Sequence, residues 1–200
     1  MHPNARFRPD SDVFCWKLLD DIAFGMVFAG TPEGPRVAHT PLVGIARKRI
    51  RFHLARDNAL TNGLDETSVL LCVNGPDGYI SPQWYDDLGE VPTWNYRAAE
   101  FEGPIRRMQE GELVDLLRAI GDQQESRLRF AQQRWNLDSV DQNKLARMLR
   151  GIAGFEMTVT TVRGTDKLSQ NKHGRERERI VEGLCQEGEM ALADAMRNHE

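Results

Sequence analysis

Residues that could hold an anion gather in the segment Phe52–Asn58. Arg56 carries a planar guanidinium, which can grip a phosphate through two parallel hydrogen bonds. His53 and Asn58 could add further hydrogen bonds, and a helix that began here would add backbone N–H donors. Taken alone, the segment is better explained as a solvated turn with one hydrogen-bonded histidine. It becomes a candidate phosphate site only in combination with other features.

Aromatic side chains are concentrated in one stretch of the chain. All three tyrosines lie between residues 79 and 96, together with Trp84 and Trp94. Pro82 and Pro92 restrict the backbone of the same stretch. Rigid rings with polar neighbours could form the wall of a pocket for a flat, partly polar ligand. The residues by themselves favour the alternative, in which these rings fill the core or a subunit interface.

A third polar segment, Lys167–Asn171, is predicted to be a loop after a late strand. Lys167 could neutralise a phosphate or the electron-rich edge of a reduced ring. The alternative is a flexible, solvated connection. The following run, Arg175–Arg179, alternates in charge, which is typical of an exposed helix face.

The sequence lacks the motifs of nucleotide hydrolases, dinucleotide-binding enzymes, zinc proteases and serine hydrolases. The histidines do not have the paired spacing of metal ligands; they are His2, His39, His53, His173 and His199. The cysteines are odd in number and far apart, at Cys15, Cys72 and Cys185. We therefore expect no metal site and no disulfide framework, and we expect reduced thiols in a cytoplasmic protein.

Length and charge limit the class of protein. A chain of 200 residues suits one domain with a sizeable core. The net charge of −4 argues against a protein held mainly by the backbone of a nucleic acid. No apolar run approaches the length of a membrane span, and the first residues lack the apolar core of a secretory signal.

Hydrophobic periodicity predicts one helix followed by several strands. Phe14, Leu18 and Ile22 recur at helical spacing, and Ser11 or Asp12 can cap that helix. Strands are predicted at 24–29, 36–43, 50–54, 69–73, 79–81 and 155–162, with at least one more within 93–108, bent near residues 103–104. Residues 74–78 contain glycine, proline and aspartate and predict a hairpin turn.

The rest of the chain is predicted to be mainly helical. Leu113, Leu116, Leu117 and Ile120 mark an amphipathic helix that continues to about Trp135. A second helix follows around residues 145–152, and a charged helix ends the chain. Strands in a run with short turns favour an antiparallel sheet. We therefore expect an α+β fold, mainly β: a single domain 1–200 formed by a small antiparallel barrel with helices outside, including a helical insertion at about 111–152 and one C-terminal helix at about 175–198.

Five segments, in this order, resemble the PaiB-like family of FMN-binding negative transcriptional regulators. They are His53-Leu54-Ala55-Arg56-x-Asn58, Tyr79-Ile80-Ser81-Pro82-x-Trp84-Tyr85, Val91-Pro92-Thr93-Trp94-Asn95-Tyr96, Gly154-Phe155-Glu156 and Lys167-Leu168-Ser169-Gln170-Asn171. The resemblance covers nearly the whole chain, from about Phe7 to the last helix. Each motif is weak alone, and the five in order form a fairly specific pattern.

The resemblance implies an antiparallel six-stranded split barrel of Greek-key type, related to the pyridoxamine phosphate oxidase group. It further implies a homodimer with FMN at the subunit interface. Phosphate and ribityl contacts would come from His53, Arg56 and Asn58. The ring site would be lined by Trp84, Trp94, Asn95 and Tyr96, with Lys167 and Gln170 reaching the site from the partner subunit.

Three functions follow from these observations. The first is an FMN-binding protein that acts, directly or indirectly, as a negative regulator of transcription; DNA is a weakly supported partner, because the chain is acidic and shows no helix-turn-helix. The second is a flavin-dependent oxidoreductase that transfers a hydride through bound FMN. The third is an interaction module without cofactor. Its support is the segment Asp86–Glu90, which is short and acidic where family members carry a longer, lysine-bearing loop.

Overall fold

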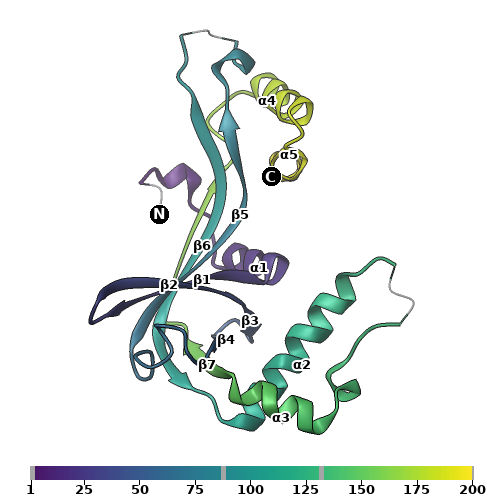
Figure 1. Ribbon diagram of the computed structural model, residues 1–200. Helices are drawn as coiled ribbons and strands as arrows, with labels where there is room; N and C mark the ends of the chain where they lie inside the picture. Colours follow the sequence, from purple (N-terminus) through teal and green to yellow (C-terminus); the bar gives the residue numbers. More distant parts are fainter. Residues whose placement is uncertain (1–2, 87–88, 131–132, 200) are drawn as a thin grey trace. The chain divides into compact units, whose positions relative to one another are not determined.

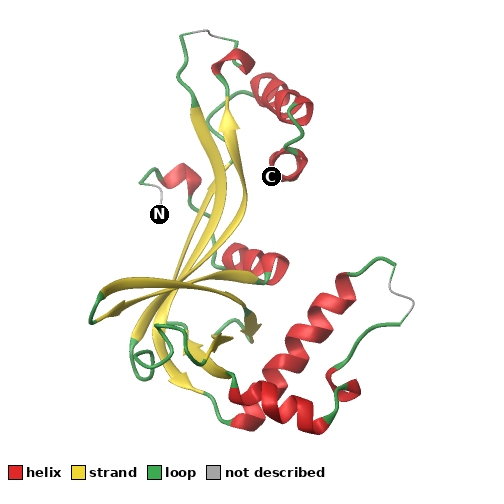
Figure 2. Ribbon diagram, in the orientation of Figure 1, coloured by secondary structure: helices red, strands yellow, loops and turns green. Residues whose placement is uncertain are grey.

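The computed structural model describes residues 3–86, 89–130 and 133–199. It contains an antiparallel sheet and several helices (Figures 1 and 2). The α-helices are α1 (Val13–Ile22), α2 (Glu110–Arg127), α3 (Gln142–Arg150), α4 (Gly174–Gln186) and α5 (Met190–Arg197). The strands are β1 (Phe24–Thr31), β2 (Gly34–Pro41), β3 (Val43–Ile45), β4 (Arg49–Ala55), β5 (Ser68–Ile80), β6 (Thr93–Arg107), β7 (Ile152–Thr158) and β8 (Thr161–Lys167). Short 3₁₀ turns are η1 (Ala5–Phe7), η2 (Pro82–Trp84) and η3 (Leu137–Ser139).

The strands follow the order β2-β1-β5-β6-β7-β4-β3, and β8 pairs with β6. Strand pairs β1–β2, β1–β5, β3–β4, β4–β7 and β6–β7 are antiparallel. The predicted α+β class with an antiparallel sheet is confirmed. The count of six strands is approximate, since the described residues form eight. Of the strands predicted from the pattern, 36–43 and 155–162 are each divided in two, and 69–73 and 79–81 are joined in β5.

The chain forms two compact units. The first unit comprises the described residues of 1–18, 74–99 and 163–200, and the second unit those of 19–73 and 100–162. Helix α1 and strands β5, β6 and β8 contribute residues to both units.

The second unit contains the curved part of the sheet. The hydroxyl of Thr40 donates to the carbonyl oxygen of His53 at 2.6 Å, which connects β2, at one end of the strand order, to β4, near the other end. The sheet therefore curls on itself, as in a barrel. Phe52 and Phe155 face each other across β4 and β7, are fully buried, and stack with their ring centroids 5.6 Å apart.

Helices α2 and α3 pack through a leucine cluster formed by Leu113, Leu116, Leu137, Leu145 and Leu149. The predicted continuation of the first of these helices to about Trp135 is wrong. Helix α2 ends at Arg127, and Leu128 has extended backbone angles. The chain then turns back, because the indole of Trp135 packs against Gly121 and its backbone N–H donates to the carboxylate of Glu125.

The C-terminal helices pack in the first unit and contribute most of its apolar cluster. The predicted single helix at 175–198 is wrong, since α4 and α5 are separated by Gly188. This glycine has a φ of +85°, in the left-handed region that ends helices. Both helices still contribute to one apolar cluster with the end of β5, which includes Ile80, Ile180, Leu184, Leu192 and Met196.

Residues 74–78 do not form the predicted hairpin turn; they lie inside the continuous strand β5. The glycines of this segment allow close packing instead of a turn. A Cβ on Gly75 would lie 2.8 Å from a methyl of Leu18, and one on Gly78 would lie 2.9 Å from a methyl of Leu192. Local turn propensity therefore gave the wrong prediction, because Gly75 and Gly78 are required by close tertiary contacts and not by a turn.

The late predicted strand, Phe155–Val162, is divided between β7 and β8. The backbone N–H of Val159 donates to Lys48 and that of Thr160 donates to Glu102, so the chain changes strand partner here. Gly103 lies beside this crossing, and a Cβ on it would overlap the carbonyl of Thr158. The predicted bend near residues 103–104 does not interrupt β6.

We expect Gly103→Ala to lower the free energy of unfolding by about 1–3 kcal/mol, the usual cost of overpacking. The control is Gly63→Ala in the same unit, where an added Cβ meets no atom within 4 Å. Urea unfolding followed by circular dichroism measures both. Equal midpoints for the two variants would contradict the close approach at Gly103.

Candidate functional site

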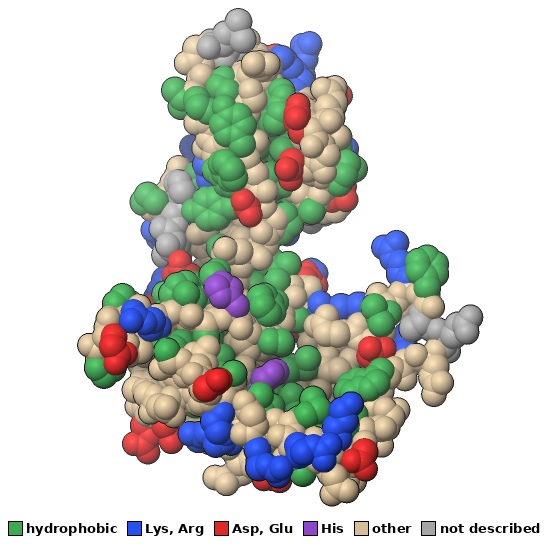
Figure 3. All heavy atoms as spheres, in the orientation of Figure 1, with side chains coloured by type: hydrophobic (Ala, Val, Ile, Leu, Met, Phe, Trp, Pro, Cys, Tyr) green, Lys and Arg blue, Asp and Glu red, His purple; other side chains and the backbone are tan. Residues whose placement is uncertain are grey.

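Three arginines line a cavity of about 130 Å³ in the second unit. Arg56 follows β4, Arg107 ends β6 and Arg150 ends α3. We call this the arginine cavity. Its other lining residues are largely apolar, and Glu110 is the one carboxylate among them. Figure 3 shows Lys and Arg side chains gathered along the lower edge of the visible face, over α3 and the neighbouring segments.

Arg56 is held in place by the end of α3. Its Nε donates to the carbonyl of Arg150 at 2.7 Å, and its Nη2 donates to that of Ile152 at 3.1 Å. The backbone N–H of Arg56 also donates to the carbonyl of Gly151. These bonds satisfy carbonyl groups that a helix end leaves open, and they fix the positive charge at the cavity wall.

His53 lies on β4 directly opposite Gly154, which itself lines the arginine cavity. Its Nδ1 is buried and has no hydrogen-bond partner among the described residues. Burial lowers the pKa of the imidazole below its usual value of 6.5, so the ring is neutral at pH 7. A buried ring nitrogen without a partner is costly, and a bound polar ligand would satisfy it.

Asn58 shapes the turn that follows β4. Its Oδ1 accepts a hydrogen bond from the backbone N–H of Leu60 at 3.0 Å. The chain therefore places His53, Arg56 and Asn58 within one strand end and turn, with only His53 retaining a buried, unsatisfied polar atom. The proposed ligand contacts of all three stay predictions.

Sequence reasoning missed Arg107 and Arg150 as cavity residues. They are separated from Arg56 by 51 and 94 positions and carry no local motif. Arg107 is the last residue of a strand and Arg150 the last residue of a helix. This position indicates a binding site only weakly, since charged side chains are common at such ends. The pairing of both β4 and β6 with β7, together with the packing of α3, brings them to Arg56.

A buried carboxylate, Glu156, lies two residues from Gly154 on β7. It accepts hydrogen bonds from Arg51 at 2.6 Å and from Arg106 at 2.8 Å, and it pairs with Arg49 at 3.4 Å. Burial alone would raise the pKa of Glu156, but the hydrogen bonds from Arg51 and Arg106 outweigh it and hold the pKa below the usual range.

The same arginines connect to α2. Arg106 also binds Glu112, whose pKa is lowered to about 2 by this hydrogen bond and by the backbone N–H of Gln109. The network ties β4, β6 and β7 to the start of α2, next to the wall of the arginine cavity.

The aromatic stretch lies in the first unit, and its rings have different surroundings. The indole of Trp94 is half exposed, donates from Nε1 to Asp77 at 2.8 Å, and meets Tyr79 edge-on at 6.3 Å. Trp84 packs against Gly183 of α4, and Tyr96 is partly buried.

The remaining predicted residues of the first unit have internal partners. Asn95 is fully buried, and its Nδ2 donates to Ser169 at 2.9 Å. The Nζ of Lys167 donates to the hydroxyl of Thr93 at 2.5 Å and to the carbonyl of Trp94 at 2.7 Å. Burial lowers the pKa of Lys167.

Gln170 is also oriented by neighbours in the first unit. Its Oε1 accepts from the backbone N–H of Leu168, and its Nε2 contacts the carbonyl of Asp166 and the ring of His199. These internal contacts account for Asn95, Lys167 and Gln170, and the flavin roles of all six first-unit residues stay predictions. In the acidic segment, residues 87–88 lie outside those described, while Asp86 pairs with Arg179 and Glu90 with Lys172.

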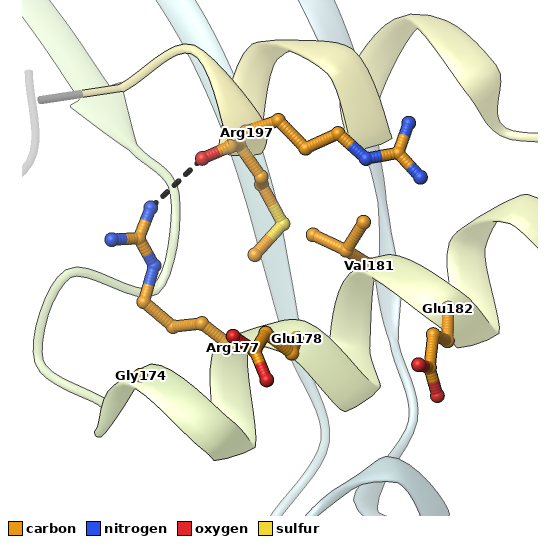
Figure 4. Close-up of a pocket in the computed structure, with 7 residues that line it drawn as sticks. Gly174, Arg177, Glu178, Val181, Glu182 and Arg197 are labelled. Atoms are coloured by element: carbon orange, nitrogen blue, oxygen red, sulfur yellow. Dashed lines mark hydrogen bonds between the residues drawn. The ribbon is translucent and has the colours of Figure 1, made fainter.

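A larger cavity of about 340 Å³ lies between α4 and α5, and none of the predicted site residues lines it. Figure 4 shows Arg177 of α4 reaching α5, where it donates to the carbonyl of Met196. Arg177 thus joins the two helices, and Val181 with Met196 gives the cavity an apolar surface.

Comparison with known proteins decides the family. A family model described as "Putative FMN-binding domain" matches residues 1–161. The chain belongs to this FMN-binding family. It is 29% identical over 177 residues to the protein called "Protease synthase and sporulation protein PAI 2" from Bacillus subtilis, with 86% of this chain and 83% of that protein covered. An uncharacterized protein of Emericella nidulans is 24% identical over 164 residues, covering 68% of this chain and 65% of that protein.

Solved structures support the same fold. The flavocytochrome Anf3 from Azotobacter vinelandii has a TM-score of 0.62 at 16% identity, with 84% of this chain and 72% of that chain covered. The FAD and heme binding protein from Mycobacterium smegmatis has a TM-score of 0.61 at 13% identity, with 86% and 78% covered. At such identities the likeness concerns the fold alone.

The chain is therefore an FMN-binding protein with a split-barrel fold. This result stands against the alternative of a module without cofactor. The residues of the arginine cavity fit the group, because guanidinium donors suit a phosphate ester. His53, the strand partner of the lining residue Gly154, offers a buried nitrogen in need of a partner. Among the described helices, none is long and apolar enough to cross a membrane.

We expect Glu156→Gln to lower the free energy of unfolding by about 3 kcal/mol, because it leaves a group of arginines without their buried counter-charge. Glu187→Gln, at an exposed position, is the control and should change it by less than about 0.5 kcal/mol. Chemical unfolding at pH 7 measures both. Similar stability of the two variants would show that the network contributes little.

The same network predicts acid sensitivity. The folded pKa values of Glu156 and Glu112 lie below the usual 4.5, so their contribution to stability is present above pH 4.5 and is lost as the pH falls toward 2. Glu156→Gln should therefore flatten the decline of the melting temperature between pH 4.5 and pH 2. An unchanged decline in this variant would assign acid unfolding to other groups.

Proposed function

We propose that this protein is an FMN-dependent oxidoreductase that binds the flavin phosphate in the arginine cavity. The observation that carries the proposal is the unsatisfied, buried Nδ1 of His53, whose strand partner Gly154 lines a cavity with three guanidinium groups. Bound FMN supplies a hydride acceptor, so the protein itself needs no catalytic acid–base pair. The split-barrel fold and the family support the cofactor.

The residues divide the task of holding a phosphate. Arg107 and Arg150 have exposed side chains that can swing onto a phosphate, while Arg56 is fixed by the carbonyls of Arg150 and Ile152. The neutral imidazole of His53 hydrogen-bonds a ribityl or phosphate oxygen. Arg56 therefore contributes a fixed charge, and the other two arginines contribute the direct hydrogen bonds.

Among the first-unit residues assigned to the ring by resemblance, Trp94 and Tyr96 have surface available to a ligand. We propose that these two contact the ring in the homodimer, where the resemblance places FMN at the subunit interface. Four other residues already contact or hydrogen-bond residues of the first unit, and we assign them the role of holding Trp94 and Tyr96 in position: Trp84, Asn95, Lys167 and Gln170. FMN should therefore quench tryptophan fluorescence in the natural protein and quench it less in Trp94→Phe.

We further propose a homodimer in which β1 and β2 of the second unit meet a second copy. Phe24, Phe28 and Val37 are exposed on these strands, and Phe28 and Val37 lie opposite each other. The outward face of an antiparallel sheet is normally polar, so an apolar outward face indicates a covered surface. Because the face holds uncharged residues, two copies of it can meet without repulsion.

A role in regulation is the second candidate, and the relationship to PAI 2 is the observation that favours it. The net charge of −4 favours an indirect route, through the flavin state or a partner, over direct DNA binding. The cytoplasm is the expected compartment, as predicted from the odd number and wide spacing of the cysteines.

We expect Arg107→Gln combined with Arg150→Gln to raise the Kd for FMN at least tenfold, since each charge-assisted hydrogen bond contributes about 1.5–3 kcal/mol. The control is Arg36→Gln, because Arg36 is exposed and bonds only its neighbour Pro35 among the described residues. Flavin fluorescence titration measures both. Equal FMN affinity in the two proteins would place the phosphate elsewhere.

Activity is tested separately from binding. NADH or NADPH, added anaerobically to the flavin-loaded protein, should bleach the flavin absorbance faster than that of free FMN. Bleaching at the free-flavin rate would exclude the function of a nicotinamide-dependent oxidoreductase. The regulatory function would then be the remaining candidate. Gel-shift experiments at moderate salt then test DNA binding directly.

A further inference from the structure

The first unit contains a second charged cavity, of about 330 Å³, and of its lining residues the FMN proposal names Gln170 alone. Segments from both ends of the chain meet there: Arg6 and Arg8 from the start, and Asn198 and His199 from the end. Arg97 of β6, with Asp166 and Gln170, lines the middle. Its volume lies within the range of small-molecule pockets, roughly 300–1,000 Å³.

Arg97 is held rigidly at this cavity. Its Nε and Nη2 donate to the two carboxylate oxygens of Asp166 at 2.8 and 2.9 Å, and its guanidinium lies 4.9 Å from the ring centroid of Phe14. This pair cancels one positive and one negative charge. Nη1 of Arg97 is left without a hydrogen bond to the described residues.

Among the other lining residues, positive charges outnumber negative charges. Arg6 and Arg8 form no ion pair with a described residue, and Asp10 is the one other carboxylate among the lining residues. The cavity therefore has an excess of positive charge even with His199 neutral. Guanidinium groups without a carboxylate partner favour an oxyanion.

Neutral donors and an apolar surface complete the lining. The Oε1 of Gln170 accepts from Leu168, so its amide nitrogen faces His199 at 3.1 Å. The same ring nitrogen, Nε2 of His199, also lies 3.6 Å from the carboxylate of Asp166. Phe14 and Pro9 contribute the apolar part.

We propose that this cavity binds a small organic oxyanion, a phosphate or carboxylate attached to a compact apolar or aromatic group. Arg6 and Arg8 hold the oxyanion, Arg97 orients it through Nη1, and Phe14 packs against the apolar group. This site is distinct from the arginine cavity and goes beyond the proposed FMN binding.

The probe is phenyl phosphate, added to the full-length, FMN-loaded protein and followed by nitrogen–proton NMR. We expect the side-chain amide signals of Gln170 to shift with the added probe. We also expect Arg6→Gln combined with Arg8→Gln to raise the Kd about tenfold, while Arg36→Gln leaves it unchanged. Circular dichroism confirms that each variant is folded.

Three outcomes would overturn the proposal. The first is the absence of any shift at Gln170. The second is equal affinity of the double variant and the natural protein. The third is loss of the Gln170 shift in Arg107→Gln, which would show that the probe acts through the FMN site. A control with benzyl alcohol in place of phenyl phosphate should give no shift at Gln170, because the oxyanion is missing.

Discussion

The pairing of β4 with β7 determines most of what this structure can do. About a hundred residues separate the two strands, and their register sets His53 opposite Gly154 and Phe52 opposite Phe155. One face of the pair builds the core through the stacked phenylalanines. The other face carries His53, Arg49, Arg51 and Glu156. A shift by one residue would exchange the two faces and remove both the core and the site.

The buried carboxylate of Glu156 reinforces this register. Three arginines surround it, and two of them, Arg51 and Arg106, also pair with Glu112 of α2, so the strands and the helix are tied through charge as well as apolar contact. A buried ion network of this kind has a high desolvation cost, and it is stable only when every partner is in place. It therefore favours one arrangement of β4, β6, β7 and α2, the elements that also surround the arginine cavity.

Sequence periodicity was sufficient for elements whose apolar pattern is local. Helix α1 and strands β1 and β4 lie close to their predicted positions. The pattern failed where distant contacts override local preference. Gly75 and Gly78 were interpreted as turn residues, yet they serve close packing against Leu18 and Leu192 inside β5. The apolar stripe of the C-terminal region continues across Gly188, so periodicity alone did not separate α4 from α5.

The sequence by itself determined the class of fold and the FMN-binding family, and it singled out the segment around Arg56 as a candidate phosphate site. These depend on short motifs and on local periodicity, which the order of residues contains directly. The tertiary structure alone decided which charges converge. Arg107 and Arg150 reach Arg56, and Arg6 and Arg8 reach His199, because strand pairing and helix packing bring together residues that are far apart in the chain. No local pattern encodes such convergence, since each arginine by itself is an ordinary exposed side chain.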